Sequence, residues 1–264
     1  MNEKIASMIN AEAFPTPFCP GCGHGILMNA VLRAFAELEF DLKNTLFVSG
    51  IGCAAWIPSP HFKADTLHTL HGRAIAYATG AKLFNPKLKI MVVSGDGDIS
   101  SIGGNHLIHA ARRNMDMTVV CANNSIYGMT GGQAASTTPV GSFTLTTPKG
   151  NPDRPFDLCK LAEAAGATFV ARTAVAFPVP LTKTLKRAIT HTGFSFVEVL
   201  SPCPTQYGRR NALRSPFEMI KAMRNDSVTL DRTKTAPPEE WQGKIVLGEF
   251  LQASDSKPQA GGER

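Results

Sequence analysis

The sequence lacks any long hydrophobic run. A membrane-spanning helix needs about 20 consecutive apolar residues, whereas the apolar runs here, such as 90–93 and 119–122, are short. Residues 1–17 also lack the basic segment followed by an apolar stretch that marks a secretory signal. We therefore expect a cytoplasmic protein that neither spans nor binds a membrane.

Clusters of like charge are missing as well. The 27 Lys and Arg residues exceed the 21 Asp and Glu residues by six, but they are scattered, with only short pairs such as Arg112-Arg113. A basic stripe with interleaved aromatic residues would be expected of a nucleic-acid-binding protein, so this class is disfavoured. A net charge of +6 is compatible with an acidic protein partner or a phosphorylated ligand.

No repeat or low-complexity segment is evident either. With 43% hydrophobic and 18% charged residues, the chain has the composition of a globular protein, which excludes bulk disorder, coiled coil and collagen. Short apolar segments typical of buried strands alternate with segments of helical periodicity, and this alternation predicts a doubly wound α/β fold with a mostly parallel sheet. The predicted strands are 45–49, 89–94, 117–122, 168–171 and 194–200, and the predicted helices are 29–39, 72–83, 100–113, 156–165 and 180–192.

We expect three parts along the chain. Residues 1–18 are predicted to form a loop-like arm, 19–250 the α/β domain, and 251–264 a flexible polar tail. The tail prediction rests on the polar sequence that begins at Ser254.

The most informative motif is Gly-Asp-Gly-Asp at 95–98, directly after a predicted buried strand. Asn124 follows the next buried strand, and ligands of doubly wound sheets bind beyond the carboxyl ends of the strands. Asp96, Asn124 and the carbonyl of Ile126 offer the oxygen ligands that Mg²⁺ prefers, while Gly95 and Gly97 allow the backbone to approach a phosphate. Gly-Asp-Gly alone would indicate only a turn, but its combination with Asn-Asn on the next strand resembles the thiamine diphosphate motif.

Six cysteines in a cytoplasmic chain argue against a disulfide scaffold. Cys19 and Cys22 form a C-x₂-C pair, while Cys53 and Cys203 each follow a predicted strand. Four thiolates can hold an iron–sulfur cluster or a zinc ion, and the spacing does not decide between the two. The other two cysteines, in apolar surroundings, are predicted to be small buried hydrophobic residues: Cys121 and Cys159.

Taken in order, CPGCGHG, GIGC, LHGRA, GDGD, NNSIYGMTGGQ and SPCPT form a combination that resembles the β subunit of 2-oxoacid:ferredoxin oxidoreductases. The resemblance extends from about Phe14 to Phe250. It implies thiamine diphosphate, Mg²⁺ and one four-iron four-sulfur (4Fe-4S) cluster as cofactors. The implied cluster ligands are Cys19, Cys22, Cys53 and Cys203, and the implied Mg²⁺ ligands are Asp96, Asn124 and the carbonyl of Ile126. The implied lining of the cofactor site is Ile51, Gly52, Cys53, Ala54, His71, Gly95, Gly97, Asp98, Gly128 and Met129.

The resemblance also implies a reaction, in which a 2-oxoacid is oxidatively decarboxylated with coenzyme A and ferredoxin, or formed by the reverse reductive carboxylation. Gly131 stands where some members have a lysine, and this favours 2-oxoglutarate over pyruvate or branched-chain 2-oxoacids. His71 is a candidate for hydrogen bonding or proton transfer at the substrate, and Arg73 for holding a carboxylate. Either residue can instead be structural, and His24 is equally ambiguous.

Activation of the pyrimidine ring in related thiamine enzymes requires a second domain, for which this chain has no counterpart. We therefore expect an α subunit as partner, in an αβ heterodimer or an (αβ)₂ assembly. Two other functions stay open: a non-redox thiamine enzyme with a structural zinc, and an electron-transfer module that has lost thiamine chemistry.

Overall fold

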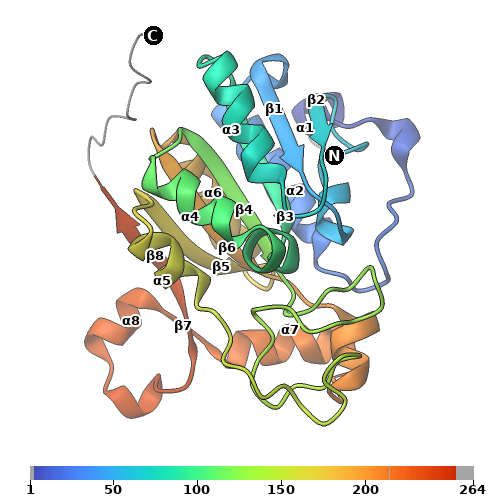
Figure 1. Ribbon diagram of the computed structural model, residues 1–264, viewed down its shortest axis with the longest axis vertical. Coiled ribbons are helices and arrows are strands. Elements are labelled where there is room, and N and C mark those ends of the chain that lie inside the picture. Colours follow the sequence, from blue (N-terminus) through green and yellow to red (C-terminus); the bar gives the residue numbers. More distant parts are fainter. Residues whose placement is uncertain (1–2, 214, 254–264) are drawn as a thin grey trace.

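Eight strands form one sheet in the computed structural model, which describes residues 3–213 and 215–253 (Figure 1). Their order across the sheet is β2-β1-β3-β4-β6-β5-β8-β7. The bounds are β1 Thr45–Ser49, β2 Asp65–His68, β3 Lys89–Gly95, β4 Met117–Asn123, β5 Phe169–Ala174, β6 Phe194–Leu200, β7 Ser227–Thr229 and β8 Ile245–Gln252. Every neighbouring pair is parallel except β5 and β8, which confirms the mostly parallel sheet.

The central strands owe their position to apolar sequence. Every residue of β4 is buried, and β3 and β6 are buried along most of their length. Strands without polar alternation are stable only when both faces of the sheet are covered. These three strands therefore occupy the middle of the sheet.

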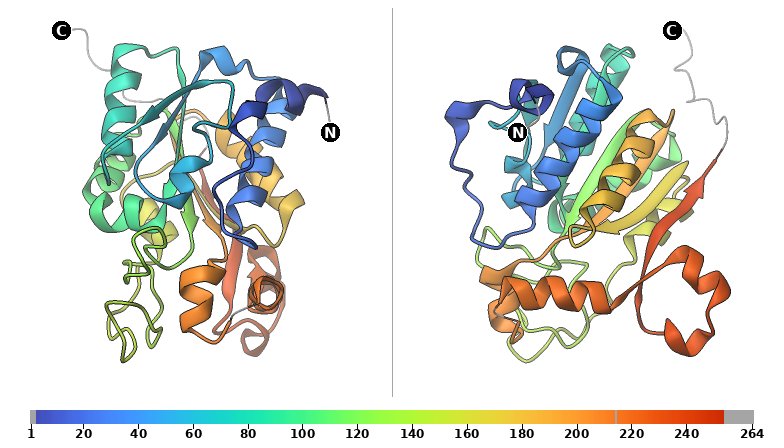
Figure 2. Two further views of the ribbon diagram at one scale, coloured as in Figure 1. Left: turned by 90° about the vertical axis from the view of Figure 1, so that its right-hand side faces the viewer. Right: turned by 180° about the vertical axis from the view of Figure 1, so that it is seen from behind.

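Helices cover both faces, as a doubly wound fold requires. On one face lie α2 (His24–Leu38) and α6 (Pro178–Thr190), and on the other α3 (Ala74–Phe84), α4 (Gly104–Arg112) and α5 (Leu158–Ala164) (Figures 1 and 2). Each face has its own apolar core, built around Phe35 and Phe47 on the first and around Phe194 and Phe196 on the second. No helix in the described part of the chain is both long and apolar enough to span a bilayer.

The ends of the chain differ from the prediction. The expected loop-like arm contains helix α1 (Glu3–Met8), whose Ile5 is buried, and Ile9 forms an isolated β-bridge with Phe62. Apolar contacts with the first core order this segment. Strand β8 continues to Gln252, so the tail predicted from 251 begins within a strand, and its residues from 254 onward lie outside the described ones.

The prediction did not include β2, β7 and β8 or two C-terminal helices, α7 (Pro216–Asn225) and α8 (Leu230–Thr235). The predicted helix 100–113 is divided into a π-helical turn, η4 (Gly97–Ile102), and α4. Five short 3-10 or π-helical turns complete the chain: η1 Ala11–Ala13, η2 Leu42–Asn44, η3 Cys53–Trp56, η5 Pro204–Gly208 and η6 Pro238–Glu240.

Candidate functional site

The loops that follow β1, β3 and β4 meet at one edge of the sheet and enclose a pocket. Since the three strands are parallel neighbours, their carboxyl ends lie together there. The residues predicted to line the cofactor site or to bind Mg²⁺ all contribute to its wall: Ile51, Gly52, Cys53, Ala54, His71, Gly95, Asp96, Gly97, Asp98, Asn124, Ile126, Gly128 and Met129. The fold thus brings together segments that are more than 70 positions apart in the sequence.

Asp96 is one of two buried acids in this pocket, with 1% of its surface exposed. The Thr137 hydroxyl donates to Oδ2, and the backbone N–H of Asn124 donates to Oδ1 at 3.4 Å. Burial raises the pKa of Asp96 to about 6, although these hydrogen bonds oppose the rise. Within residues 3–213 and 215–253, no Lys or Arg pairs with Asp96. A buried carboxylate without a counter-charge is the donor expected of a cation site.

The loop after β4 presents the other two predicted magnesium ligands, Asn124 and Ile126. Between them, Ser125 has a φ of +61°, a left-handed conformation that is unfavourable for residues other than glycine, asparagine and aspartate. The side-chain oxygen of Asn123 accepts a hydrogen bond from the Ser125 amide at 2.9 Å, and the Thr138 hydroxyl donates to the Ser125 carbonyl at 2.6 Å. These two bonds stabilise the turn that separates the ligands.

Asp98 organises the opposite wall of the pocket. Its buried carboxylate accepts hydrogen bonds from the Ile51 amide at 3.1 Å, the Gly72 amide at 2.7 Å and the Ser94 hydroxyl at 2.8 Å, and it pairs with Nδ1 of His71. Asp98 therefore joins the loop after β1, which contains Ile51, to the loop that contains His71 and Gly72.

Of the two predicted catalytic residues, the structure places only His71 at the pocket. Its contact with Asp98 holds the ring there, edge-on to Tyr127. Arg73 is instead held at the start of α3, where its guanidinium donates to the carbonyls of Gly72 at 3.1 Å and Ile102 at 3.2 Å. The predicted carboxylate contact of Arg73 therefore has no support from this pocket.

Four of the six cysteines, Cys19, Cys22, Cys53 and Cys203, line a second cavity of about 280 Å³ beside the first. The buried residue His24 lies between the two and lines both. Burial lowers the pKa of His24 to about 4, so its imidazole is neutral at pH 7.

The cysteine cavity suits a soft metal centre in its donor chemistry. Burial, together with the other three thiols, raises the pKa of Cys22 to about 12, so bound metal would have to displace its proton. A Cβ atom on Gly128 would lie 3.6 Å from the Cys203 sulfur and 3.9 Å from the Cys53 sulfur, so the glycine leaves space beside them. As the side chains stand, however, no three His, Cys, Asp or Glu residues among those described form a metal-binding group.

The other two cysteines behave as predicted, since Cys121 and Cys159 are buried within the second core. Sequence reasoning missed Tyr127 and Thr137, which contact residues of the pocket. Tyr127 donates its hydroxyl to the Gly97 carbonyl at 3.0 Å, and it could have been found within the NNSIYGMTGGQ motif. Thr137, which contacts Asp96, lies 41 residues away from it in a segment without a recognisable pattern.

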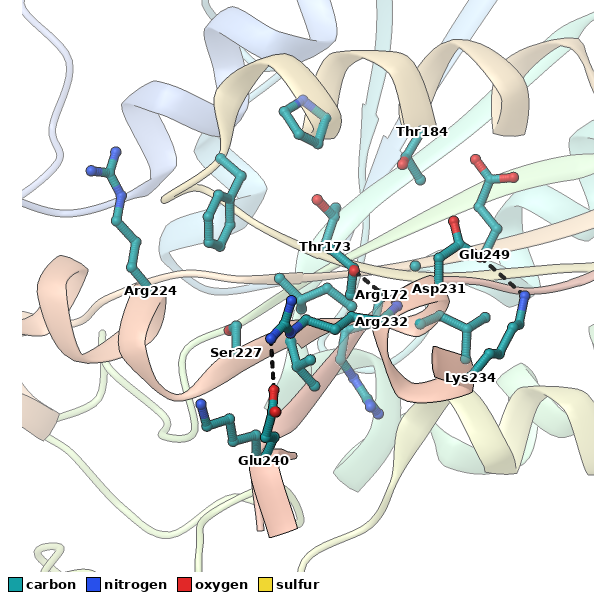
Figure 3. Close-up of a pocket in the computed structure, with 18 of the residues that line it drawn as sticks. Arg172, Thr173, Thr184, Arg224, Ser227, Asp231, Arg232, Lys234, Glu240 and Glu249 are labelled. Carbon is teal, nitrogen blue, oxygen red and sulfur yellow. Dashed lines mark hydrogen bonds and ion pairs between the residues drawn. The ribbon is translucent and has the colours of Figure 1, made fainter. Parts of the chain in front are cut away.

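A more voluminous cavity, of about 1120 Å³, lies elsewhere (Figure 3). It is a groove between β5, α6 and the C-terminal segment β7–α8–β8, and charged side chains line it. Most of these charges are neutralised within the chain, for example by the Arg232–Glu240 pair at 2.6 Å and the Arg187–Glu249 pair at 2.7 Å. Size alone therefore does not mark this groove as the reactive site.

Comparison with known proteins points to the same edge of the sheet. Residues 50–199 match the family described as thiamine pyrophosphate enzyme, C-terminal TPP binding domain. The chain is 49% identical to 2-oxoglutarate synthase subunit KorB of Methanothermobacter marburgensis, over 93% of this chain and 86% of that one. It is 44% identical to the 2-oxoacid:ferredoxin oxidoreductase subunit beta of Saccharolobus solfataricus, over 71% and 62%.

A solved structure has the same fold with a TM-score of 0.85 and 34% identity, covering 97% of this chain and 87% of that one. It is the 2-oxoglutarate:ferredoxin oxidoreductase from Magnetococcus marinus with 2-oxoglutarate, coenzyme A and succinyl-CoA bound.

Proposed function

The chain belongs to the family of β subunits of 2-oxoacid:ferredoxin oxidoreductases, and we propose that its own reaction is the oxidative decarboxylation of 2-oxoglutarate. The 2-oxoacid and coenzyme A give succinyl-CoA and carbon dioxide, and two electrons pass to ferredoxin. The same groups would serve the reverse reductive carboxylation if a low-potential donor supplied the electrons.

The observation that carries this proposal is the uncompensated Asp96 beside Asn124 and the Ile126 carbonyl, in a pocket with glycines at 95 and 97. These three groups would hold Mg²⁺, and the glycine backbone would lie against the diphosphate of thiamine diphosphate. Bound thiamine diphosphate supplies the carbanion chemistry at the 2-oxo carbon. The chain contributes the position of the cofactor and the electrostatic environment.

His71 is the side chain of this chain best placed to act on the substrate. Its Nδ1 is engaged by Asp98, so Nε2 is the atom left to exchange a proton or a hydrogen bond with a reacting group. Arg73 is not part of the proposal, because its guanidinium contacts backbone carbonyls at the start of α3.

We propose a 4Fe-4S cluster on Cys19, Cys22, Cys53 and Cys203. The support is that four thiols line one cavity and that this cavity shares Cys53, Gly128 and Met129 with the diphosphate pocket. Electrons leaving the substrate would then have a short path to the cluster. A structural zinc on the same thiols is the alternative, and the visible absorbance of an iron–sulfur cluster would distinguish it.

We further propose that an α subunit completes the site, as αβ or (αβ)₂. The described residues form one α/β unit, and its GDGD and NNSIYGMTGGQ motifs contribute to the diphosphate pocket. The relatives named above are likewise single subunits of larger enzymes. The half of the site that contacts the pyrimidine ring would come from this partner.

The choice of 2-oxoglutarate rests on Gly131 and on relatives of 49% and 50% identity that are named 2-oxoglutarate synthase subunits. Pyruvate and branched-chain 2-oxoacids are the competing substrates. The proposed cytoplasmic location follows from the reaction, since soluble ferredoxin and coenzyme A must both reach the enzyme.

The test is an anaerobic assay of the full chain purified with its co-expressed partner subunit. Viologen reduction is followed with coenzyme A and each of 2-oxoglutarate, pyruvate and 2-oxoisovalerate. A strong preference for 2-oxoglutarate is the expected result. Preference for another 2-oxoacid would overturn the substrate but keep the reaction, while no reduction by a preparation with full iron and thiamine diphosphate content would overturn the reaction.

A further inference from the structure

A carboxylate that lines neither proposed cofactor cavity lies buried in the middle of the sheet. Glu198 is on β6, with 3% of its surface exposed, and its direct cross-strand neighbours are Cys121 on β4 and Arg172 on β5. A buried charge is unfavourable unless it is paired and hydrogen-bonded. Glu198 therefore needs an explanation from its contacts.

Both oxygens of Glu198 are engaged. Oε2 accepts hydrogen bonds from Nε of Arg172 at 2.6 Å and from the Cys159 thiol at 3.4 Å. Arg172, which lines the groove of Figure 3, also donates to Asp157 at 2.5 Å. Oε1 accepts from the side-chain amide of Asn123 at 2.7 Å. The carboxylate thus links the arginine to the residue that precedes Asn124.

The contact with Asn123 determines which way its amide faces. A carboxylate only accepts hydrogen bonds, so the NH₂ group of Asn123 must face Glu198. The amide oxygen then faces the Ser125 N–H, from which it accepts at 2.9 Å. If the amide rotated by 180°, its NH₂ would oppose that N–H and the bond would be lost. This bond supports Ser125 at its positive φ of 61°.

We propose that Glu198 is a positioning residue for the cation site. By holding the Asn123 amide in one orientation, it stabilises the left-handed turn at Ser125 and so places the Asn124 side chain and the Ile126 carbonyl together. The expected effect on the binding of Mg²⁺ and thiamine diphosphate rests on the proposed function. The expected effect on the turn at Ser125 does not depend on that function.

The diagnostic variant is Glu198→Gln. Glutamine has a single acceptor oxygen, for which the charged Arg172 competes with Asn123. We expect the oxygen to go to Arg172, and affinity for thiamine diphosphate with Mg²⁺ to fall by about 10- to 100-fold, as is typical when a partner of a metal ligand is removed. The measurement is a binding titration of the full chain with its partner subunit.

Adding Arg172→Met to Glu198→Gln provides a rescue. Without the competing guanidinium, the glutamine oxygen is free to accept from Asn123. Most of the lost affinity should then return, because Arg172 and Glu198 are in contact and the effects of substitutions at contacting residues are not additive. A purely structural role of Glu198 predicts instead that the second substitution makes the loss larger.

Two further variants complete the set. Cys159→Ser is the matched control, because it keeps a donor to Oε2 in the same buried shell without touching Asn123, and its affinity should match the wild type. Asn123→Ala removes the amide but leaves the Arg172–Glu198 pair intact. Asn123→Ala should lose as much affinity for thiamine diphosphate as is expected of Glu198→Gln. It therefore tests the proposal even if Glu198→Gln folds poorly.

A second readout needs no cofactor. In the full chain without ligand, hydrogen exchange of the Ser125 amide should accelerate by on the order of 10-fold in Glu198→Gln and Asn123→Ala. It should return to the wild-type rate in the double variant and stay there in Cys159→Ser. Unchanged exchange in Glu198→Gln, or no rescue by Arg172→Met, would overturn the role of Glu198. Failure of the wild type to bind thiamine diphosphate would count against the proposed function, while the exchange data would still decide this inference.

Discussion

The cofactor pocket and the groove of Figure 3 both contain acidic side chains, but they neutralise them differently. In the groove, Glu240 and Glu249 each lie within 2.7 Å of an arginine nitrogen. In the pocket, Asp96 has only neutral donors around it, and burial raises its pKa to about 6. Most charges of the groove are neutralised in ion pairs, while the pocket carries a buried acid that no Lys or Arg of the described residues pairs with.

A buried carboxylate without a counter-charge is therefore a better marker of the candidate site than the volume of a cavity is. The groove is more than three times larger than the cysteine cavity, yet most of its charges already have partners. The small pocket is the part of the fold in which a bound cation would relieve a cost that folding has left in place. Four substitutions or conditions test this comparison.

The largest effect is expected from Asp96→Ala. Loss of the carboxylate should lower the affinity for Mg²⁺ and thiamine diphosphate by at least about 100-fold, beyond the typical effect of removing an outer-shell partner. Retained thiamine diphosphate is measured after gel filtration. Glu249→Gln in the groove is the matched control, with retention equal to the wild type. Equal losses in both variants would break the comparison.

Cys203→Ser should affect the other cavity. We expect loss of the visible absorbance of the cluster and of viologen reduction, with thiamine diphosphate still retained, because the thiol lines the cysteine cavity and not the diphosphate pocket. Cys159→Ser serves as control and should keep both. Unchanged absorbance in Cys203→Ser would remove this residue from the cluster.

The pH dependence of stability gives an intermediate effect. The pKa of Asp96 is about 6 in the folded chain and 3.8 ordinarily, so the folded state binds the proton more tightly. Its contribution to stability is complete below pH 3.8 and is lost as the pH rises through 6. In the metal-free chain this loss is on the order of 2–3 kcal/mol.

Denaturant unfolding at pH 4.5 and 7 measures this effect. The difference should shrink in Asp96→Asn, and addition of Mg²⁺ with thiamine diphosphate at pH 7 should restore stability. Glu240→Gln in the groove should keep the wild-type pH dependence. The opposite result would be a gain in stability of the metal-free chain between pH 4.5 and 7 that follows the ionisation of Asp96. It would contradict the conclusion that this carboxylate has no counter-charge.

The smallest effect is expected in the groove itself. Glu240→Ala removes the pair with Arg232, whose two side chains are 48% and 63% exposed. Surface pairs of this kind contribute less than about 1 kcal/mol, so unfolding should change little and turnover not at all. A fall in turnover comparable to that of Asp96→Ala would show that the groove takes part in the reaction.

Much of the fold could be predicted, because buried parallel strands have apolar sequences. Strands β1 and β6 have the predicted bounds, and β3 and β4 extend one residue further than predicted. β2 was missed because it is short and largely exposed. β8 was missed because Gly248 interrupts its apolar sequence. Its pairing with β5 also contains an irregularity between Val170 and Ala171.

The residues predicted to line the cofactor site lie around one pocket because each belongs to a loop after a parallel strand, and topology brings such loops together. Arg73 shows the limit of this reasoning. It lies two positions from His71, but the turn at Gly72, with a φ of +71°, directs the chain into α3. Proximity in sequence therefore did not place its guanidinium in the pocket.

Residue types and local spacing were enough to identify the family, the order of the central strands along the chain and the candidate donors for each proposed cofactor. Tertiary structure alone decided which donors remain unpaired and which residues orient them. Thr137 reaches Asp96 across 41 positions, and Glu198 reaches Asn123 across 75. Such contacts follow from strand register and packing, which join segments whose sequences carry no sign of each other.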